Sequence, residues 1–90
     1  MDGAGIVTVE FFGIPRQRAG RAELQVAAGT VADLLAAVVQ ACPGLAGVVR
    51  DGRLGPHYLL SLDGRQFVSD PATVLRPGER LLLLSADAGG

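Results

Sequence analysis

The 90-residue sequence lacks several residue types that functional sites often need. It has no tryptophan and no lysine, one histidine (His57) and one cysteine (Cys42). A single cysteine excludes an internal disulfide and a cysteine-rich metal site, and His57 has no second histidine near it, so we expect no bound metal. We expect His57 to lie in a surface loop and Cys42 to be a small buried hydrophobe.

Aromatic residues are also scarce, and neither positive nor negative charge is in clear excess. Aromatic residues make up 4% of the chain, and eight arginines against nine acidic residues leave a net charge of −1. The chain therefore has no general positive field to hold nucleic acid through its phosphates, and few rings on which bases would stack. Without lysine, the protein cannot be modified on lysines of its own. Ser61 and Ser85 have no plausible base, which argues against a serine hydrolase.

Long apolar runs are missing as well. None approaches the roughly 20 residues of a membrane-spanning helix, and the N-terminus lacks the charged and apolar regions of a signal peptide. These absences predict a soluble, cytoplasmic protein with no membrane partner. What the chain does have is aliphatic residues, because 49% of it is hydrophobic. Its length predicts one small domain with a core of Val, Leu and Ala.

The first half of the chain predicts two strands and a helix. Alternating apolar residues indicate strands over 6–12 and 22–27, joined as a hairpin by a polar loop over 16–21. Thr30 is a good helix N-cap, and Asp33 occupies the acidic position of a capping box. The apolar residues that follow recur at helical spacing and form one stripe: Val31, Leu34, Leu35, Val38 and Cys42. Pro43-Gly44 ends this helix of about 12 residues.

The second half predicts mainly strands. Segment 45–56 is rich in glycine and is expected to be a loop with a helical turn. Strands follow over 58–62, 65–68 and 80–85, with Asp63-Gly64 as a hairpin turn. Because the run Leu81–Leu84 is apolar at every position, we expect a central strand covered on both faces.

This order of elements predicts an α+β domain of the ubiquitin-like β-grasp type. We expect a mixed sheet of four to five strands with one main helix packed on one face. In that arrangement the C-terminal strand lies parallel beside the first strand. Residues 1–85 would form the β-grasp domain, and residues 86–90, which lack a bulky anchor, would form a flexible tail ending in Gly89-Gly90.

Short motifs along nearly the whole chain support this fold. They are Phe11-Phe12-Gly13 with Arg16 and Ala19-Gly20, Gly29-Thr30-Val31 with Asp33-Leu34-Leu35, Pro43, Asp63-Gly64-Arg65, Leu75 with Pro77-Gly78-Glu79-Arg80, and Ala88-Gly89-Gly90. In this order and at this spacing the chain resembles the MoaD/ThiS family of small sulfur-carrier proteins, and most of all the small subunit of molybdopterin synthase. It departs from the family at Ser85 and Ala86, where two prolines are usual, and at Asp63, where Asn is usual. These departures leave the tail intact but bear on which acceptor takes the sulfur.

The resemblance implies that Gly90 carries the chemistry. An E1-like adenylyltransferase would adenylate its carboxylate with ATP, and sulfur from a desulfurase or rhodanese would displace AMP to give a thiocarboxylate. A synthase, most simply the large subunit of molybdopterin synthase, would then accept the sulfur. The protein itself would bind no cofactor and have no catalytic residue. Ala88 and Gly89 would form the thin tail that a narrow channel admits, because glycine has no Cβ.

The resemblance also implies a partner-binding surface at Phe12, Arg16 and Leu84. Such a surface, apolar and rimmed by arginine, is a usual interface composition. Three alternatives to molybdopterin synthesis remain open at this point. The sulfur could serve thiamin, cysteine or secondary-metabolite synthesis; the protein could be a ubiquitin-like modifier joined to lysines of targets; or it could be a β-grasp interaction module with an inert tail.

Overall fold

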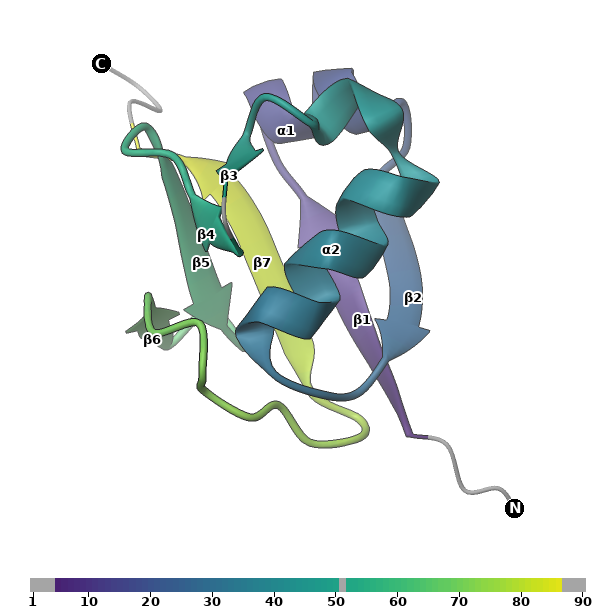
Figure 1. Ribbon diagram of the computed structural model, residues 1–90, viewed down its shortest axis with the longest axis vertical. Helices are drawn as coiled ribbons and strands as arrows, with labels where there is room; N and C mark the ends of the chain where they lie inside the picture. The colour runs from purple at the N-terminus through teal and green to yellow at the C-terminus, as the bar shows by residue number, and fades with distance from the viewer. Residues whose placement is uncertain (1–4, 51, 87–90) are drawn as a thin grey trace.

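The computed structural model describes residues 5–50 and 52–86, so the tail residues Ala88, Gly89 and Gly90 lie outside the described part. Figure 1 shows the arrangement of the elements. In chain order they are β1 (Ile6–Phe11), α1 (Ile14–Ala19), β2 (Glu23–Ala27), α2 (Val31–Ala41), the 3-10 helix η1 (Pro43–Leu45), β3 (Val49–Arg50), β4 (Arg53–Leu54), β5 (Tyr58–Leu62), β6 (Gln66–Val68) and β7 (Arg80–Ser85).

Five strands form one mixed sheet in the order β2-β1-β7-β5-β6, and β3 pairs with β4 in a separate two-stranded sheet. β1 runs parallel to β7, whereas the other neighbouring strands of the large sheet are antiparallel. α2 lies across one face of this sheet (Figure 1). The predicted α+β β-grasp architecture, with the C-terminal strand parallel beside the first, is confirmed.

The core lies between α2 and the sheet face that α2 covers. Strands β1 and β7 alternate strictly between buried and less buried positions, so each contributes every second side chain to the core. The fully buried large side chains include residues from both strands and from α2: Val7, Val9, Phe11, Leu34, Leu35, Val38, Leu81 and Leu83. This aliphatic core matches the predicted one.

Helix α2 begins as the sequence predicts. The Thr30 hydroxyl accepts a hydrogen bond from the Asp33 amide at 3.1 Å, and the Asp33 carboxylate accepts one from the Thr30 amide at 3.2 Å. This reciprocal capping box satisfies two amides that have no partner within the helix. The predicted apolar stripe is buried, including Cys42, which is 3% exposed and caps the C-terminal end of the helix.

The loop predicted over residues 16–21 is wrong, because the chain forms helix α1 there. Gly13 (φ 61°) turns the chain into the helix, Pro15 occupies its first turn, and Gly20 (φ 74°) ends it in the left-handed conformation. Six residues are too few for a periodic apolar stripe. Pro15 is the buried residue of α1, so the helix is held by its end residues and its packing rather than by a pattern that sequence reasoning detects.

Segment 45–56 and strand β7 also differ from the predictions. The expected loop contains the β3–β4 hairpin, whose turn has Gly52 at φ 74°, and two-residue strands are too short to show alternation. β7 is central, as predicted, but it is not covered on both faces. Leu81 and Leu83 are fully buried, whereas Leu82 and Leu84 are only half-buried on the open face of the sheet.

The remaining turn prediction is confirmed. Asp63 (φ 54°) and Gly64 (φ 72°) both take positive φ values in the three-residue loop, 63–65, that joins β5 to β6, and the Arg65 amide donates to the Leu62 carbonyl at 3.0 Å. The helices formed by residues 5–50 and 52–86 are all too short or too polar to cross a lipid bilayer.

The capping box generates a stability prediction. The Thr30→Ala substitution removes the hydroxyl that accepts from the Asp33 amide. It should lower the free energy of unfolding by about 1 kcal/mol. Urea denaturation followed by circular dichroism measures this change. Thr30→Ser retains the hydroxyl and is the matched control, so an equal loss in both variants would show that the cap is not the cause.

Candidate functional site

The open face of the sheet carries an apolar surface at the end of β7. Phe12, Gly13, Leu82, Leu84 and Ser85 line a shallow depression of about 300 Å³ whose exposed surface is almost wholly apolar. Phe12, the aromatic side chain of this depression, is 42% exposed. We call these five residues the open-face patch.

Backbone geometry explains why this patch stays uncovered. The Phe12 amide donates to the Leu83 carbonyl at 3.0 Å, so the pairing of β1 with β7 continues one residue past Phe11. Gly13 then turns the chain away from the sheet into α1. α1 packs against η1, where a Cβ on Gly44 would lie only 2.1 Å from the Arg18 carbonyl oxygen. Because Gly44 has no Cβ, α1 and η1 can approach each other this closely.

The three residues predicted to bind a partner fall into two adjoining depressions. Phe12 and Leu84 line the open-face patch together. Arg16 projects from α1, is exposed, and lines a second depression with Gln17 and Arg21. Gly13 lines both depressions, so the two surfaces meet at this residue. The structure therefore brings Phe12 and Leu84 together and places Arg16 at the border of their patch.

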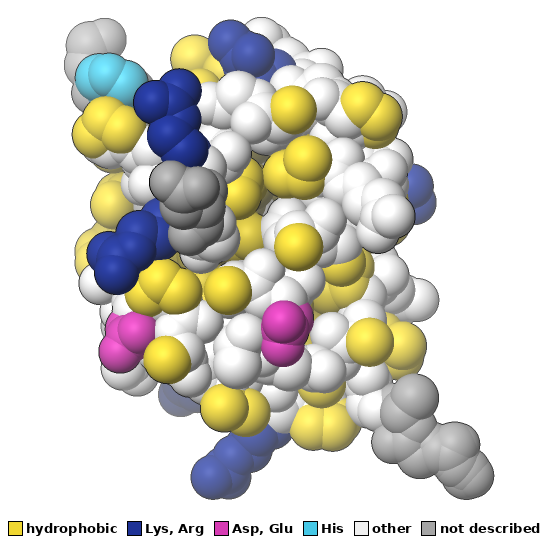
Figure 2. Space-filling model, viewed as in Figure 1, with side chains coloured by type: hydrophobic (Ala, Val, Ile, Leu, Met, Phe, Trp, Pro, Cys, Tyr) yellow, Lys and Arg dark blue, Asp and Glu magenta, His cyan; other side chains and the backbone are white. Residues whose placement is uncertain are grey.

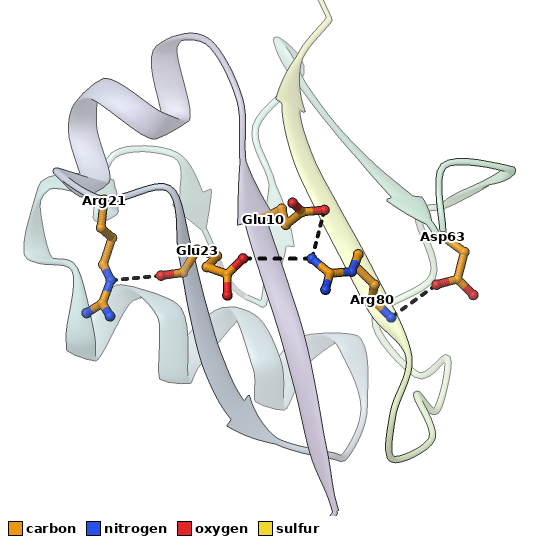
Figure 3. A network of polar contacts seen from close by, with 5 residues as sticks. All are labelled: Glu10, Arg21, Glu23, Asp63 and Arg80. Carbon is orange, nitrogen blue, oxygen red and sulfur yellow. Dashed lines mark hydrogen bonds and ion pairs between the residues drawn. The ribbon is translucent and has the colours of Figure 1, made fainter.

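A charged cluster lies on the same sheet face at the other end of β7, and sequence reasoning did not identify it. One nitrogen of the Arg80 guanidinium lies 3.1 Å from Glu10 and 3.8 Å from Glu23, and the Asp63 carboxylate accepts from the Arg80 amide at 3.2 Å (Figure 3). The Arg21 side chain donates to the Glu23 carbonyl at 2.8 Å. Exposed pairs of this kind contribute up to about 1 kcal/mol each. The cluster forms because the register of β1, β2 and β7 brings Glu10, Glu23 and Arg80 together, and that register is known only from the structure.

The described chain ends beside His57. The Ala86 amide donates to the His57 carbonyl at 2.8 Å, which fixes the point from which residues 87–90 continue. His57 is exposed in a turn, as predicted. Within residues 5–50 and 52–86, no group of three His, Cys, Asp or Glu side chains is placed to hold a metal ion. The predicted roles of Gly90, Gly89 and Ala88 concern residues outside the described part and stay predictions.

The strand order and the single long helix on one face define a ubiquitin-like β-grasp protein. No family model and no curated protein matches the sequence. Small archaeal modifier protein 1 from Haloferax volcanii shares the fold with a TM-score of 0.81 and 27% identity, over 96% of this chain and 100% of that one. A second structure of that modifier gives a TM-score of 0.75 and 25% identity, over 89% and 95%.

A protein from Pyrococcus furiosus assigned as molybdopterin converting factor subunit 1 gives a TM-score of 0.76 and 20% identity, over 91% of this chain and 98% of that one. These neighbours are all MoaD/ThiS-like ubiquitin-fold proteins. The resemblance predicted from the sequence motifs is therefore confirmed.

The two faces of β7 generate a stability prediction. Leu83→Ala leaves a cavity in the closed core and should lower the free energy of unfolding by about 2–5 kcal/mol. Leu84→Ala, one residue further along on the open face, should lower it by less than about 1 kcal/mol, since Leu84 already contacts water. Urea denaturation of both variants makes the comparison. Equal losses of unfolding free energy in the two variants would show that Leu84 is packed as tightly as Leu83. The open-face patch would then be a second hydrophobic core.

Proposed function

We propose that this protein is a sulfur carrier whose C-terminal glycine, Gly90, is adenylated and then converted to a thiocarboxylate. The observation that carries the proposal is the position of β7. The strand holds the centre of the sheet and ends between the open-face patch and His57, with Gly89-Gly90 of the sequence only a few residues further. Gly90 lies four residues beyond Ala86, a span of at most about 14 Å.

The chemistry needs a thin and unbranched terminus. A carboxylate oxygen of Gly90 attacks the α-phosphorus of ATP and releases pyrophosphate, and a sulfur nucleophile then attacks the acyl carbon and displaces AMP. A Cβ on Gly90 would crowd the carbon that is attacked, and glycine at position 89 lets the chain enter a narrow channel. ATP belongs to the activating enzyme, and the carrier acts as a protein co-substrate without a catalytic centre of its own.

The open-face patch would then dock the partner enzymes. Phe12 and Leu84 supply an apolar contact, and Arg16 supplies a charged border next to it. Interfaces of this composition, with an aromatic and aliphatic centre and arginine at the edge, are common between proteins. The partners are an E1-like adenylyltransferase, a sulfur donor such as a desulfurase or rhodanese, and a sulfur-accepting synthase, all in the cytoplasm.

The motif pattern favours molybdopterin synthesis as the pathway, with the large subunit of molybdopterin synthase as acceptor. Carriers for thiamin, cysteine or secondary metabolites would use the same terminus. A second function, conjugation of Gly90 to target lysines, is favoured by the similarity to small archaeal modifier protein 1 at 27% identity over its full length. Both functions begin with the same adenylate, so the fate of the activated glycine distinguishes them.

Activation at Gly90 is the first prediction of this proposal. Incubation with the E1-like adenylyltransferase of the same organism, ATP and a sulfur donor should raise the intact mass by the difference between sulfur and oxygen. Gly90→Ala should reduce this loading by at least about tenfold, because the new methyl group crowds the reacting carbon. Val74→Ala, at an exposed position near the start of α2 and away from the end of β7, is the control. Unchanged loading of the Gly90 variant would refute the assignment.

The docking role of Arg16 is tested separately. Arg16→Glu should weaken binding to the adenylyltransferase by about tenfold, since it reverses a charge at the border of the patch. The helix should still form, because the side chain of Arg16 is exposed. Isothermal titration calorimetry measures the affinity, and Arg76→Glu serves as a control on another exposed arginine. An affinity equal to that of the unmodified protein would remove Arg16 from the interface.

A further inference from the structure

The charged side chains are divided between the two ends of the molecule. The end where β7 finishes is built from α1, η1, the β3–β4 hairpin and the start of β5. In Figure 2, Arg side chains lie beside the histidine at the upper left and also at the lower edge, whereas the Asp and Glu side chains in view lie only in the lower half. By sequence, segments 13–22, 43–58 and 84–90 carry five of the eight arginines but only two of the nine acidic residues, Asp51 and Asp87.

The acidic side chains of the described residues all have partners within the protein. Glu10 and Glu23 lie beside the Arg80 guanidinium (Figure 3). The other four carboxylates each accept a hydrogen bond from a backbone amide: Asp33 from Thr30, Asp63 from Arg80, Asp70 from Ala72, and Glu79 from Arg76. The six carboxylates of the described residues are therefore engaged in holding turns and strands of the protein itself.

Four arginines at the other end have no carboxylate partner among the described residues. Arg16, Arg18, Arg50 and Arg53 are exposed, and none pairs with a carboxylate in the ranges 5–50 and 52–86. We call these four residues the basic end. Two of them, Arg50 and Arg53, stand directly opposite each other in the β3–β4 register. Like charges at such positions destabilise a strand pair.

The basic end adjoins the point where the tail begins. Arg50, Arg53 and His57 line a groove of about 540 Å³ together with residues of the loop between β4 and β5. The His57 carbonyl accepts the hydrogen bond from the Ala86 amide, so residues 87–90 continue from the rim of this groove. A partner that receives the tail must therefore approach the basic end.

We propose that the basic end is an electrostatic docking surface for an acidic protein surface that surrounds the tail-receiving site of the activating enzyme. This inference rests on the proposed function. A protein partner is favoured over nucleic acid because the chain has a net charge of −1 and only 4% aromatic residues on which bases could stack. The separated charges also orient the carrier, so that the end bearing the tail meets the acidic surface first.

Steering of this kind acts on the rate of encounter. It should raise kcat/KM for adenylation by about tenfold or more at low ionic strength and leave kcat at saturating carrier unchanged. The effect should fade as salt shortens the screening length from about 10 Å at 0.1 M to about 3 Å at 1 M.

The test uses the double variant Arg50→Glu/Arg53→Glu with the E1-like adenylyltransferase of the same organism, ATP and a pyrophosphate-release assay. The matched control is Arg65→Glu/Arg76→Glu, which makes the same change of net charge at the opposite end. We expect kcat/KM of the first variant to fall about tenfold or more at low salt and to approach that of the unmodified protein at high salt. The control should stay within about twofold, and circular dichroism checks that both variants fold.

The outcomes distinguish a failure of the proposed function from a failure of the docking surface alone. If the unmodified protein is not adenylated at Gly90, the proposed function fails and this inference falls with it. If the unmodified protein is adenylated but both double variants lose the same amount of kcat/KM, the proposed function stands and the docking surface is refuted. Salt-sensitive binding of a short fluorescent single-stranded DNA that the first variant abolishes, with unchanged adenylation, would assign the basic end to nucleic acid instead.

Discussion

The parallel pairing of β1 with β7 is the contact on which the rest of this structure depends. Val9 and Phe11 lie opposite Leu81 and Leu83 in this ladder, and all four side chains are buried against α2. The pairing brings the start and the end of the domain together in the centre of the sheet. Because parallel strands need a long crossover, everything between them, including α2 and the β3–β4 hairpin, is folded around this one contact.

The same ladder gives β7 two different faces. The alternation of a strand sends Leu81 and Leu83 into the core and leaves Leu82 and Leu84 on the open face. Within this run of four leucines, two side chains fill the core and two form part of the open-face patch. Charged residues follow a comparable division, because the acidic side chains are used within the fold, while the basic end stays available beside the tail.

The sequence was sufficient for elements that repeat a pattern over several turns or residues. Thr30 and Asp33 predicted the start of α2, and the alternation of β1 predicted its buried face. Helix α1, with six residues, and the two-residue strands β3 and β4 were missed because none is long enough to repeat its pattern twice. The open face of β7 was missed because apolar residues alone do not show whether a second layer covers them. Phe12 and Leu84 line one depression, but their role in partner binding, like the role of Gly90, stays a prediction from resemblance.

The central position of β7 has a mechanical consequence. A pull on Ala86 along the strand acts on the ladders with β1 and β5 simultaneously, in shear, so that many hydrogen bonds resist together rather than breaking one after another. An edge strand such as β6 would instead peel away from its single neighbour. The force needed to unfold the domain by a pull at the end of β7 should therefore be higher than the force needed by a pull at β6.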